Sequence, residues 1–206
     1  MPRLIDLRAI KNRLMVDVAL ALVRYETAVA QKYDYFFLRW IAKMTAVEIH
    51  ASWERYAESR LVAALNHNPE HFVSEHDIRG VKRISAGLAF YLVRGGGRYF
   101  DFRSMSDLID KGDRLVGHAR NPFRRLSQID RRYLDTLSAI RNCVVHGSSA
   151  AFASYKRLLR STYSIHKAPE PDEFLNARDT RAGSPARYES RLHGIAAVVI
   201  RAITNT

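Results

Sequence analysis

Two long stretches of helical periodicity constrain the fold of this chain more than any other feature. In residues 4–31, apolar side chains recur at intervals of three and four, which is the spacing of one buried helical face. A second stretch of this kind begins at Asp34, a candidate N-cap, and runs to about residue 66, where Asn68 and Pro69 end it. Because only a short turn separates the two helices, we expect them to be antiparallel neighbours in an all-α bundle.

The apolar stripes of these two helices identify their expected buried positions. In the first helix the stripe consists of Leu7, Ile10, Leu14, Val18, Ala21, Leu22 and Tyr25. In the second helix it consists of Phe37, Trp40, Ile41, Met44, Val47, Ala51 and Leu61. We expect both stripes to face the core.

Shorter helices are predicted in the rest of the chain. Their expected spans are about 77–93, ended by the glycines 95–97; one opening at Ser104 or Ser106; 127–147; 150–162; and 187–203. Residues 98–103 are expected to be extended, Asn121 and Pro122 to start a short turn, and 167–186 to form a proline-containing loop. We therefore predict a single domain over residues 1–206, with about six or seven helices.

Composition and cysteine usage limit the class of protein. Hydrophobic content of 47% with 26% charged residues is typical of a soluble globular chain. The longest apolar runs, VALALV and IAAVVI, are far shorter than the roughly 20 residues of a membrane span, and no signal-peptide pattern is visible at the start. The single Cys143 excludes an intramolecular disulfide and fits a reducing compartment. We expect a cytoplasmic protein without a membrane partner.

A large basic excess favours a polyanionic partner. Lys and Arg number 33 against 21 Asp and Glu, which gives a net charge of +12. Basic side chains are dense in residues 114–132 and 156–160, and arginine suits bidentate phosphate contacts. The candidate RNA-binding residues are Arg120, Arg124, Arg125, Arg131, Arg132, Lys156 and Arg157. The alternative is a solvated, solubilising surface.

Several common kinds of site are not indicated. The glycines 95–97 lack the spacing of a phosphate-binding loop and are better explained as a helix stop. His67, His71 and His76 lie in an expected loop, and one cysteine cannot build a thiolate zinc site. Cys143 has no evident base beside it, so its helical position favours packing over nucleophilic catalysis. We predict no metal ion and no cofactor.

The segment SAIRNCVVHGS, residues 138–148, is the strongest candidate for a reaction site. It ends the helix predicted from Ser127, and it carries Arg141, Asn142 and His146 just before Gly147. Cations are also favoured at a helix C-terminus by the helix dipole, so an ordinary helix end is the competing interpretation. That helix is expected to bury Tyr133, Leu134, Leu137, Ile140 and Val144.

Ideal helix geometry separates the two ionisable side chains of this segment. Arg141 and His146 are five residues apart, so they point about 140° away from each other and lie about 7.5 Å apart along the axis. We therefore do not expect them to stack on one another, and a single helix end makes a poor two-residue site. Two copies related by a two-fold axis would instead place the Arg of one chain and the His of the other along one groove.

The pattern Arg141-Asn142-x-x-x-His146 at a helix end resembles the R-x(4–6)-H signature of HEPN domains (higher eukaryotes and prokaryotes nucleotide-binding). The phrases ASWERYAESRL at 51–61 and PFRRLSQIDRRYLDTLSAIRNCVVHGSSAA at 122–151 are similar to members from prokaryotic defence and toxin–antitoxin systems, including the RiboL-PSP subgroup. The resemblance covers most of the chain as a helix pattern, and its specific part is the short motif. It implies an HEPN-like helical bundle.

The resemblance also implies an activity and roles for named residues. Active HEPN domains are metal-independent ribonucleases that dimerise and bring two motifs into one cleft. His146 would exchange protons with the ribose and the leaving oxygen, Arg141 would hold the phosphate, and Asn142 would position these groups. Glu54 would orient one of them, although its place in the middle of a long helix favours a solvated or N-terminally paired glutamate. Ser148 stands where related toxins carry a modifiable tyrosine, so control by tyrosine adenylylation is not expected.

These observations predict an endoribonuclease that cuts single-stranded or unpaired RNA by attack of the 2′-hydroxyl. By resemblance it is a toxin or anti-phage effector, a homodimer, and a partner of an antitoxin or another defence-system protein. The alternative is a non-catalytic HEPN module that binds RNA or acts as a scaffold. A DNA-binding regulator is a weaker interpretation, because no convincing helix-turn-helix is present. Retention of arginine, asparagine and histidine in the motif favours the nuclease.

Overall fold

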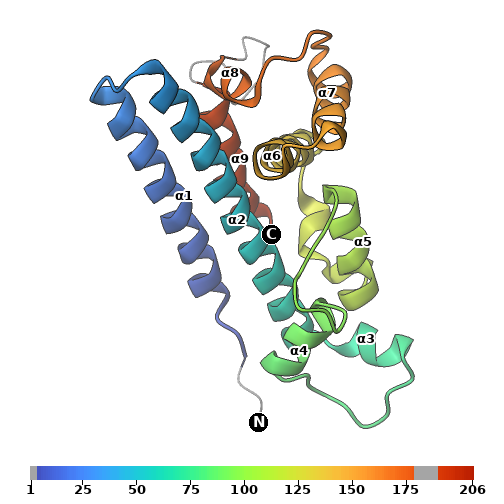
Figure 1. Ribbon diagram of the computed structural model, residues 1–206. Coiled ribbons are helices and arrows are strands. Elements are labelled where there is room, and N and C mark those ends of the chain that lie inside the picture. Colours follow the sequence, from blue (N-terminus) through green and yellow to red (C-terminus); the bar gives the residue numbers. More distant parts are fainter. Residues whose placement is uncertain (1–3, 179–189) are drawn as a thin grey trace. The chain divides into compact units, whose positions relative to one another are not determined.

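The structure of the protein is a computed structural model that describes residues 4–178 and 190–206, and these residues are helical with no strand among them (Figure 1). The prediction of an all-α fold is confirmed. Nine α-helices and two 3-10 helices lie in the described ranges, so the prediction of six or seven helices undercounts them.

The two long helices are α1 (Leu7–Ala30) and α2 (Tyr35–His67), which run antiparallel as predicted (Figure 1). Asp34 starts α2 as the expected cap, because its carboxylate accepts from the amides of Phe36 and Phe37 at 3.0 Å each. In α1 the predicted core positions Leu14, Val18, Ala21 and Tyr25 are buried.

The buried face of α2 differs from the predicted stripe. Trp40 was expected in the core but is 51% exposed, with its ring 5.6 Å from that of Phe37. The buried face includes Ala42, Ala46 and Ile49, about one residue further along the helix and therefore turned by about 100°. Small alanines face the core here, whereas the prediction followed the larger apolar side chains.

The predicted helix at 77–93 is wrong in its first half. The chain forms α3 (Glu70–Glu75) and α4 (Ala86–Val93), and the residues between them are not helical. Asp77 and Gly80 have φ angles of 48° and 75°, which an α-helix does not allow. Ser85 caps α4 by accepting from the amide of Leu88 at 3.2 Å.

Boundaries in the middle of the chain follow the predicted capping residues. The elements are α5 (Met105–Val116), η1 (His118–Arg120), η2 (Pro122–Arg125), α6 (Gln128–His146) and α7 (Ser149–Tyr163). The side chains of Ser104, Asn121 and Ser127 cap α5, η2 and α6 respectively. Gly147 ends α6 with a φ of 56°, as its position predicted. Val144, expected to be buried, is half-buried.

A short helix interrupts the segment that was predicted as a loop. The helix α8 (Pro171–Asn176) begins with proline in its first turn, where the missing N–H costs nothing, and the carboxylate of Glu173 accepts from the amide of Glu170 at 3.2 Å. Phe174 and Leu175 are fully buried, so tertiary packing holds α8. The final helix is α9 (Arg191–Asn205). Residues 179–186 of the predicted loop and 187–189 of the predicted helix lie outside the described ranges.

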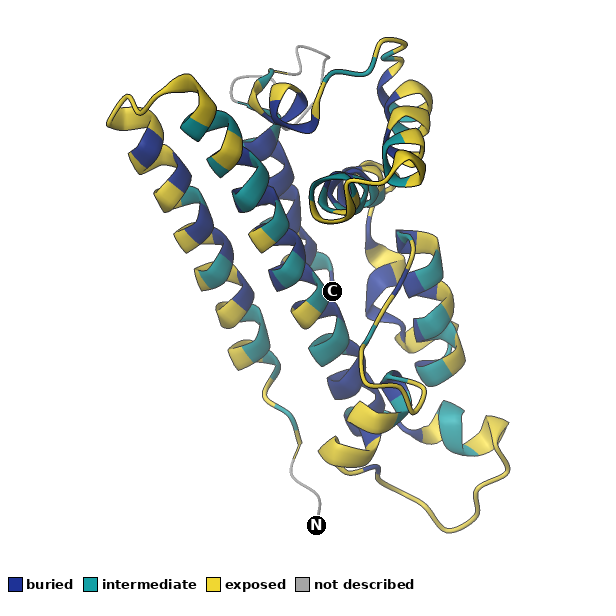
Figure 2. Cartoon of the chain, in the orientation of Figure 1, coloured by how far each residue is buried: buried dark blue, intermediate teal, exposed yellow. Residues whose placement is uncertain are grey.

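The chain divides into two compact units. The first contains residues 4–14, 53–126 and 203–206, and the second contains 15–52, 127–178 and 190–202. Helices in both have buried residues on one side and exposed residues on the other (Figure 2). The prediction that 1–206 is one domain stays a prediction.

Each unit has its own aromatic core. In the first unit Trp53 lies with its ring centre 5.6 Å from Tyr56 and 6.0 Å from Phe123. In the second unit Phe174 of α8 contacts Tyr155 and Tyr163 of α7, at 6.3 and 5.2 Å between ring centres. The Trp53–Tyr56 pair is stacked and the other three are edge-on, and both arrangements add to the stabilisation from burial alone.

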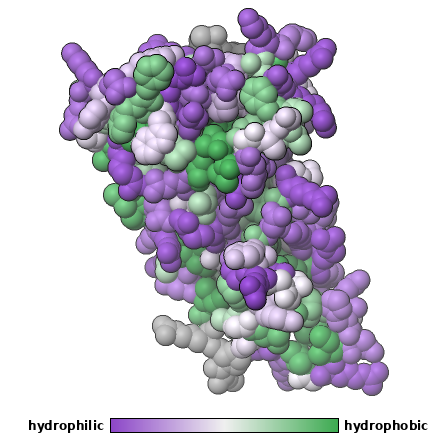
Figure 3. Space-filling model, viewed as in Figure 1, coloured by the Kyte–Doolittle hydropathy of each residue, from purple (hydrophilic) through white to green (hydrophobic). Residues whose placement is uncertain are grey.

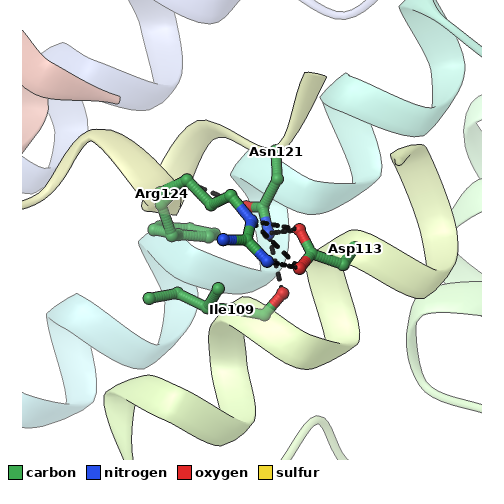
Figure 4. A network of polar contacts seen from close by, with 5 residues as sticks. Ile109, Asp113, Asn121 and Arg124 are labelled. Atoms are coloured by element: carbon green, nitrogen blue, oxygen red, sulfur yellow. Dashed lines mark hydrogen bonds and ion pairs between the residues drawn. The ribbon is translucent and has the colours of Figure 1, made fainter. Parts of the chain in front are cut away.

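A buried amide connects α5 to η2 in the first unit (Figure 4). Asn121 donates to the carbonyl of Ile109 at 2.7 Å and to the carboxylate of Asp113 at 2.8 Å, and it accepts from the amide of Phe123 at 3.0 Å. Arg124 also binds Asp113, with its Nε 2.9 and 3.0 Å from the two oxygens. The Arg124 hydrogen bond is the main reason why the pKa of Asp113 lies below its ordinary value.

Candidate active site

The helix α6 presents the motif at an exposed end. Its buried residues Leu134, Leu137 and Ile140 anchor it in the second unit, while Asn142 and His146 are exposed and Arg141 is half-buried. A connection of only two residues, Gly147 and Ser148, leads from α6 to α7. Buried residues thus anchor α6 in the core, while the polar side chains near its C-terminal end are open to solvent.

Arg141, Asn142 and His146 form one hydrogen-bonded group within a single chain. Arg141 Nη1 donates to Asn142 Oδ1 at 2.9 Å and to His146 Nε2 at 3.0 Å. The expectation that a single helix end makes a poor two-residue site is therefore wrong, because the two side chains meet within one chain. Ideal helix geometry gives only the directions of the Cα–Cβ bonds, and the long arginine side chain turns back along the helix to reach the imidazole.

The contact determines the state of the imidazole. Because a guanidinium only donates, His146 Nε2 must accept, and the proton of the neutral ring is on Nδ1. Nε2 is therefore the atom whose lone pair can take a proton. A guanidinium carries five N–H donors and these two bonds use Nη1 alone, so a cation able to bind phosphate lies directly beside a base.

The two predicted supporting residues have different positions. Ser148 caps α7, because its hydroxyl accepts from the amide of Ala151 at 3.2 Å. This explains the serine without any role in chemistry. Glu54 is half-buried in the part of α2 that belongs to the first unit, whereas the motif belongs to the second.

The predicted RNA-binding residues divide between the two units. Arg120, Arg124 and Arg125 belong to the first unit. Arg131, Arg132, Lys156 and Arg157 belong to the second unit, as the motif does. Most of the face drawn in Figure 3 is hydrophilic.

Within the second unit, the cations of α7 follow the motif most closely. Lys156 and Arg157 are exposed and lie about two helical turns after the start of α7. Arg132 is also exposed, but it precedes Arg141 by nine residues and is therefore about 14 Å away along the axis of α6. The basic residues of α7 are thus the better candidates for contacts next to the motif.

A pocket of about 440 Å³ opens beside the last turn of α6. Its walls are the turn 147–149 and the residues Lys43 of α2, Cys143 and Val144 of α6, Phe152 of α7, Pro171 of α8 and Glu170, which precedes α8. All of them belong to the second unit. Sequence reasoning missed Lys43, Phe152 and Glu170, because no local spacing connects residues from four separate helices.

The surroundings of Cys143 in the pocket wall make its thiol harder to ionise. Burial, followed by the charge of Glu170, raises the pKa of the thiol from 9.0 to about 11. Between pH 9 and 11 the thiol therefore stays protonated in the folded protein but ionises in the unfolded chain. For this reason the contribution of Cys143 to the free energy of unfolding falls as the pH rises above 9. The thiol fits the packing role predicted for it.

We expect alkylation of Cys143 in the folded protein to follow a titration with a midpoint near pH 11. Iodoacetamide labelling measured against pH, with circular dichroism as a check of folding, gives this midpoint. The urea-unfolded chain should titrate about two pH units lower, and Cys143→Ser should remove labelling because the chain has no other cysteine. Rapid labelling of the folded protein at pH 7 would contradict the assignment.

Tyr155 of α7 supplies a prediction about the core of the second unit. Its side chain is fully buried, its hydroxyl has no hydrogen-bond partner among the described residues, and burial raises its pKa. Because an unsatisfied buried hydroxyl is costly, Tyr155→Phe should leave the free energy of unfolding unchanged or raise it by about 1 kcal/mol. Urea unfolding measures the change.

A matched variant is Tyr163→Phe in the same helix. The Tyr163 hydroxyl lies 3.1 Å from Thr136 Oγ1 and is buried, so its loss should lower the free energy of unfolding by about 1 kcal/mol. Equal destabilisation by both substitutions would show that the Tyr155 hydroxyl has a partner after all.

Comparisons with protein-family models, with curated proteins and with solved structures gave no match.

Within residues 4–178 and 190–206, no group of three or more His, Cys, Asp or Glu side chains could hold a metal ion. The helices in these ranges also lack any segment that is long and apolar enough to cross a membrane.

Proposed function

We propose that the protein is a metal-independent endoribonuclease of HEPN type that cuts single-stranded or unpaired RNA. The observation that carries this proposal is the 3.0 Å contact between Arg141 and His146, which places a phosphate-binding cation and a proton acceptor at one exposed helix end. The net charge of +12 supports an anionic substrate. We further propose that it acts in the cytoplasm as a toxin or anti-phage effector, with an antitoxin or another defence-system protein as partner.

The chemistry follows from the properties of the two side chains. His146 Nε2 takes the proton of a ribose 2′-hydroxyl, and the 2′-oxygen attacks the adjacent phosphorus. The bond from phosphorus to the 5′-oxygen breaks, and that oxygen leaves with a proton from an imidazolium. Arg141 binds the non-bridging oxygens and offsets the charge that develops on them. The products are a 2′,3′-cyclic phosphate and a 5′-hydroxyl.

We propose a homodimer as the working unit, with two motifs bordering one cleft. A cleft of this kind admits a single strand, whose bases can splay apart while the backbone enters. In a dimer, one neutral imidazole can accept the 2′-hydroxyl proton while the other, as an imidazolium, protonates the leaving oxygen. The contact within each chain means that dimerisation is not needed to bring Arg141 to a histidine.

The deciding experiment is incubation of the purified protein with total RNA, with and without EDTA. We expect cleavage in both conditions, fragments ending in 2′,3′-cyclic phosphate, and no cutting of DNA, which lacks the 2′-hydroxyl. Loss of cleavage in EDTA, or equal cutting of DNA, would contradict the proposal.

One observation favours the alternative of an RNA-binding module without cleavage. Arg141 already occupies His146 Nε2, so the atom that should accept the proton is hydrogen-bonded before RNA arrives. If the contact persists in the complex, the motif can hold phosphate but cannot take a proton. RNA binding without any cleavage in the same assay would establish this alternative.

Lys156 and Arg157 provide a test of RNA contact that does not depend on cleavage. If each contacts a phosphate, Lys156→Ala and Arg157→Ala should weaken binding to all sequences alike and lower the slope of log K against log salt by about 0.7 each for single strands. Arg124→Ala serves as a comparison, because Asp113 already compensates the charge of Arg124. Unchanged slopes for both α7 variants would identify these residues as a solvated surface.

A further inference from the structure

The pocket beside the motif is built partly from the motif itself. Cys143 and Gly147 line it, and each follows a site residue, Asn142 or His146, by one position, so the pocket borders the helical face next to the site. A nucleotide whose phosphate binds at the end of α6 therefore has its base within reach of the pocket. The volume of about 440 Å³ is within the range of sites that enclose small ligands.

The apolar part of the wall suits a flat ring. Val144, Phe152 and Pro171 contribute apolar surface, and Phe152 offers an aromatic ring for stacking. The ammonium of Lys156 lies 4.4 Å from the centre of the Phe152 ring, so a cation already covers part of this aromatic group. Base stacking on an aromatic side chain with a neighbouring cation is a common way to hold single-stranded RNA.

Two opposite charges complete the wall. Lys43 contributes an ammonium, which also lies 3.9 Å from Asp172 Oδ1. Glu170 contributes a carboxylate from the residue that precedes α8, and its backbone amide is bonded to Glu173 at 3.2 Å. After burial, the Glu170 charge is the second cause of the raised pKa of the Cys143 thiol, which lines the same pocket.

The hydrogen-bonding pattern of each of the four bases can be compared with this charge pair. Guanine presents two neighbouring donors, N1–H and the N2 amino group, which together match a carboxylate, and its O6 and N7 acceptors match an ammonium. Adenine and cytosine offer a single amino group next to a ring acceptor, which repels a carboxylate. Uracil has one N–H between two carbonyls. Guanine is thus the best complement to Glu170 and Lys43.

We infer that this pocket binds a guanine base of the RNA next to the cleaved phosphodiester, with Glu170 on its N1 and N2 donors, Lys43 on its O6 or N7, and Phe152 against its ring. This inference rests on the proposed ribonuclease function for the position of the base relative to the cut. Binding of the base itself is a property of the pocket and can be measured without cleavage.

The test is calorimetric titration of the intact protein with 3′-GMP, 3′-AMP, 3′-CMP and 3′-UMP. We expect 3′-GMP to bind at least about tenfold more tightly than the other three, and Glu170→Gln to remove this difference while keeping the size of the side chain. Glu75→Gln, an exposed glutamate of α3 in the first unit, is the matched control and should leave the preference intact. Equal binding of all four nucleotides, or a preference that survives Glu170→Gln, would overturn the inference.

Mapping of cleavage sites separates this inference from the proposed function. RNA cut without enrichment of guanine beside the cut would overturn the guanine pocket and leave the ribonuclease standing. Selective binding of 3′-GMP that Glu170→Gln abolishes, with no RNA cleavage, would support the pocket and overturn the nuclease.

Discussion

Replacing either Arg141 or His146 with alanine should lower the rate of RNA cleavage by about two to four orders of magnitude. The loss of His146 removes the proton acceptor, and the loss of Arg141 removes the main charge that stabilises the phosphorane-like transition state. The rate is measured on a short single-stranded RNA with excess enzyme, so that the chemical step is observed. Both residues lie on an exposed helix end, and we expect the variants to keep the fold and thermal stability of the parent chain.

The control variants come from the same helix and from residues of the same kind. Arg132→Ala removes an exposed arginine at the other end of α6 and should affect cleavage far less than Arg141→Ala. Arg141→Lys keeps the charge but loses the planar guanidinium, so partial activity is expected. Equal losses for Arg132→Ala and Arg141→Ala would show that the charge of α6, and not the motif, sets the rate.

Mixed dimers show which Arg and His work together. A subunit with Arg141→Ala retains its His146, and a subunit with His146→Ala retains its Arg141. If the contact within one chain is the working pair, no site of the mixed dimer is complete and activity stays low. If the site is shared across a two-fold axis, one complete pair forms and activity partly returns. The 3.0 Å contact within one chain favours the first outcome.

The parts of the fold that local chemistry determines could be predicted from the sequence. The caps at Ser104, Asn121 and Ser127 satisfy helix N-termini through neighbouring residues only, and the spans that follow them agree with the structure. Where packing between segments far apart in the sequence determines a helix or its buried face, the sequence predicted that feature less well. The helix α8 is held by burial of Phe174 and Leu175, and the core face of α2 is set by small alanines that carry little hydrophobic signal.

In the candidate site too, features set by neighbouring residues were predictable, and features set by packing were not. The motif residues are close in sequence, so their presence at the end of α6 was predictable, whereas their contact was not, because it depends on the torsion angles of the Arg141 side chain. The pocket joins Lys43 and Glu170, which are 127 residues apart in the sequence, through the packing of four helices. A single sequence carries no spacing from which such a site can be found.

The second large effect is expected where α5 meets Asn121. A Cβ atom added at Gly112 would lie 2.6 Å from Asn121 Nδ2 and 2.7 Å from its Cγ and Oδ1, which is closer than side chains can pack. Gly112→Ala should therefore lower the free energy of unfolding by about 2 kcal/mol, even though alanine favours helices. Gly87→Ala in α4 is the matched control, because a Cβ there meets nothing within 4 Å, and it should be neutral or stabilise by about 0.5 to 1 kcal/mol.

Combining Gly112→Ala with Asn121→Ala tests the cause. Asn121→Ala alone removes the hydrogen bonds to Ile109, Asp113 and Phe123 and should destabilise by about 3 kcal/mol. It also empties the space that the Cβ added by Gly112→Ala would need, so the double variant should be destabilised by about 3 kcal/mol instead of the additive value of about 5. Chemical denaturation of the four proteins measures this coupling of about 2 kcal/mol. Strict additivity would show that the two substitutions act independently and that the close approach of Gly112 to Asn121 has no energetic role.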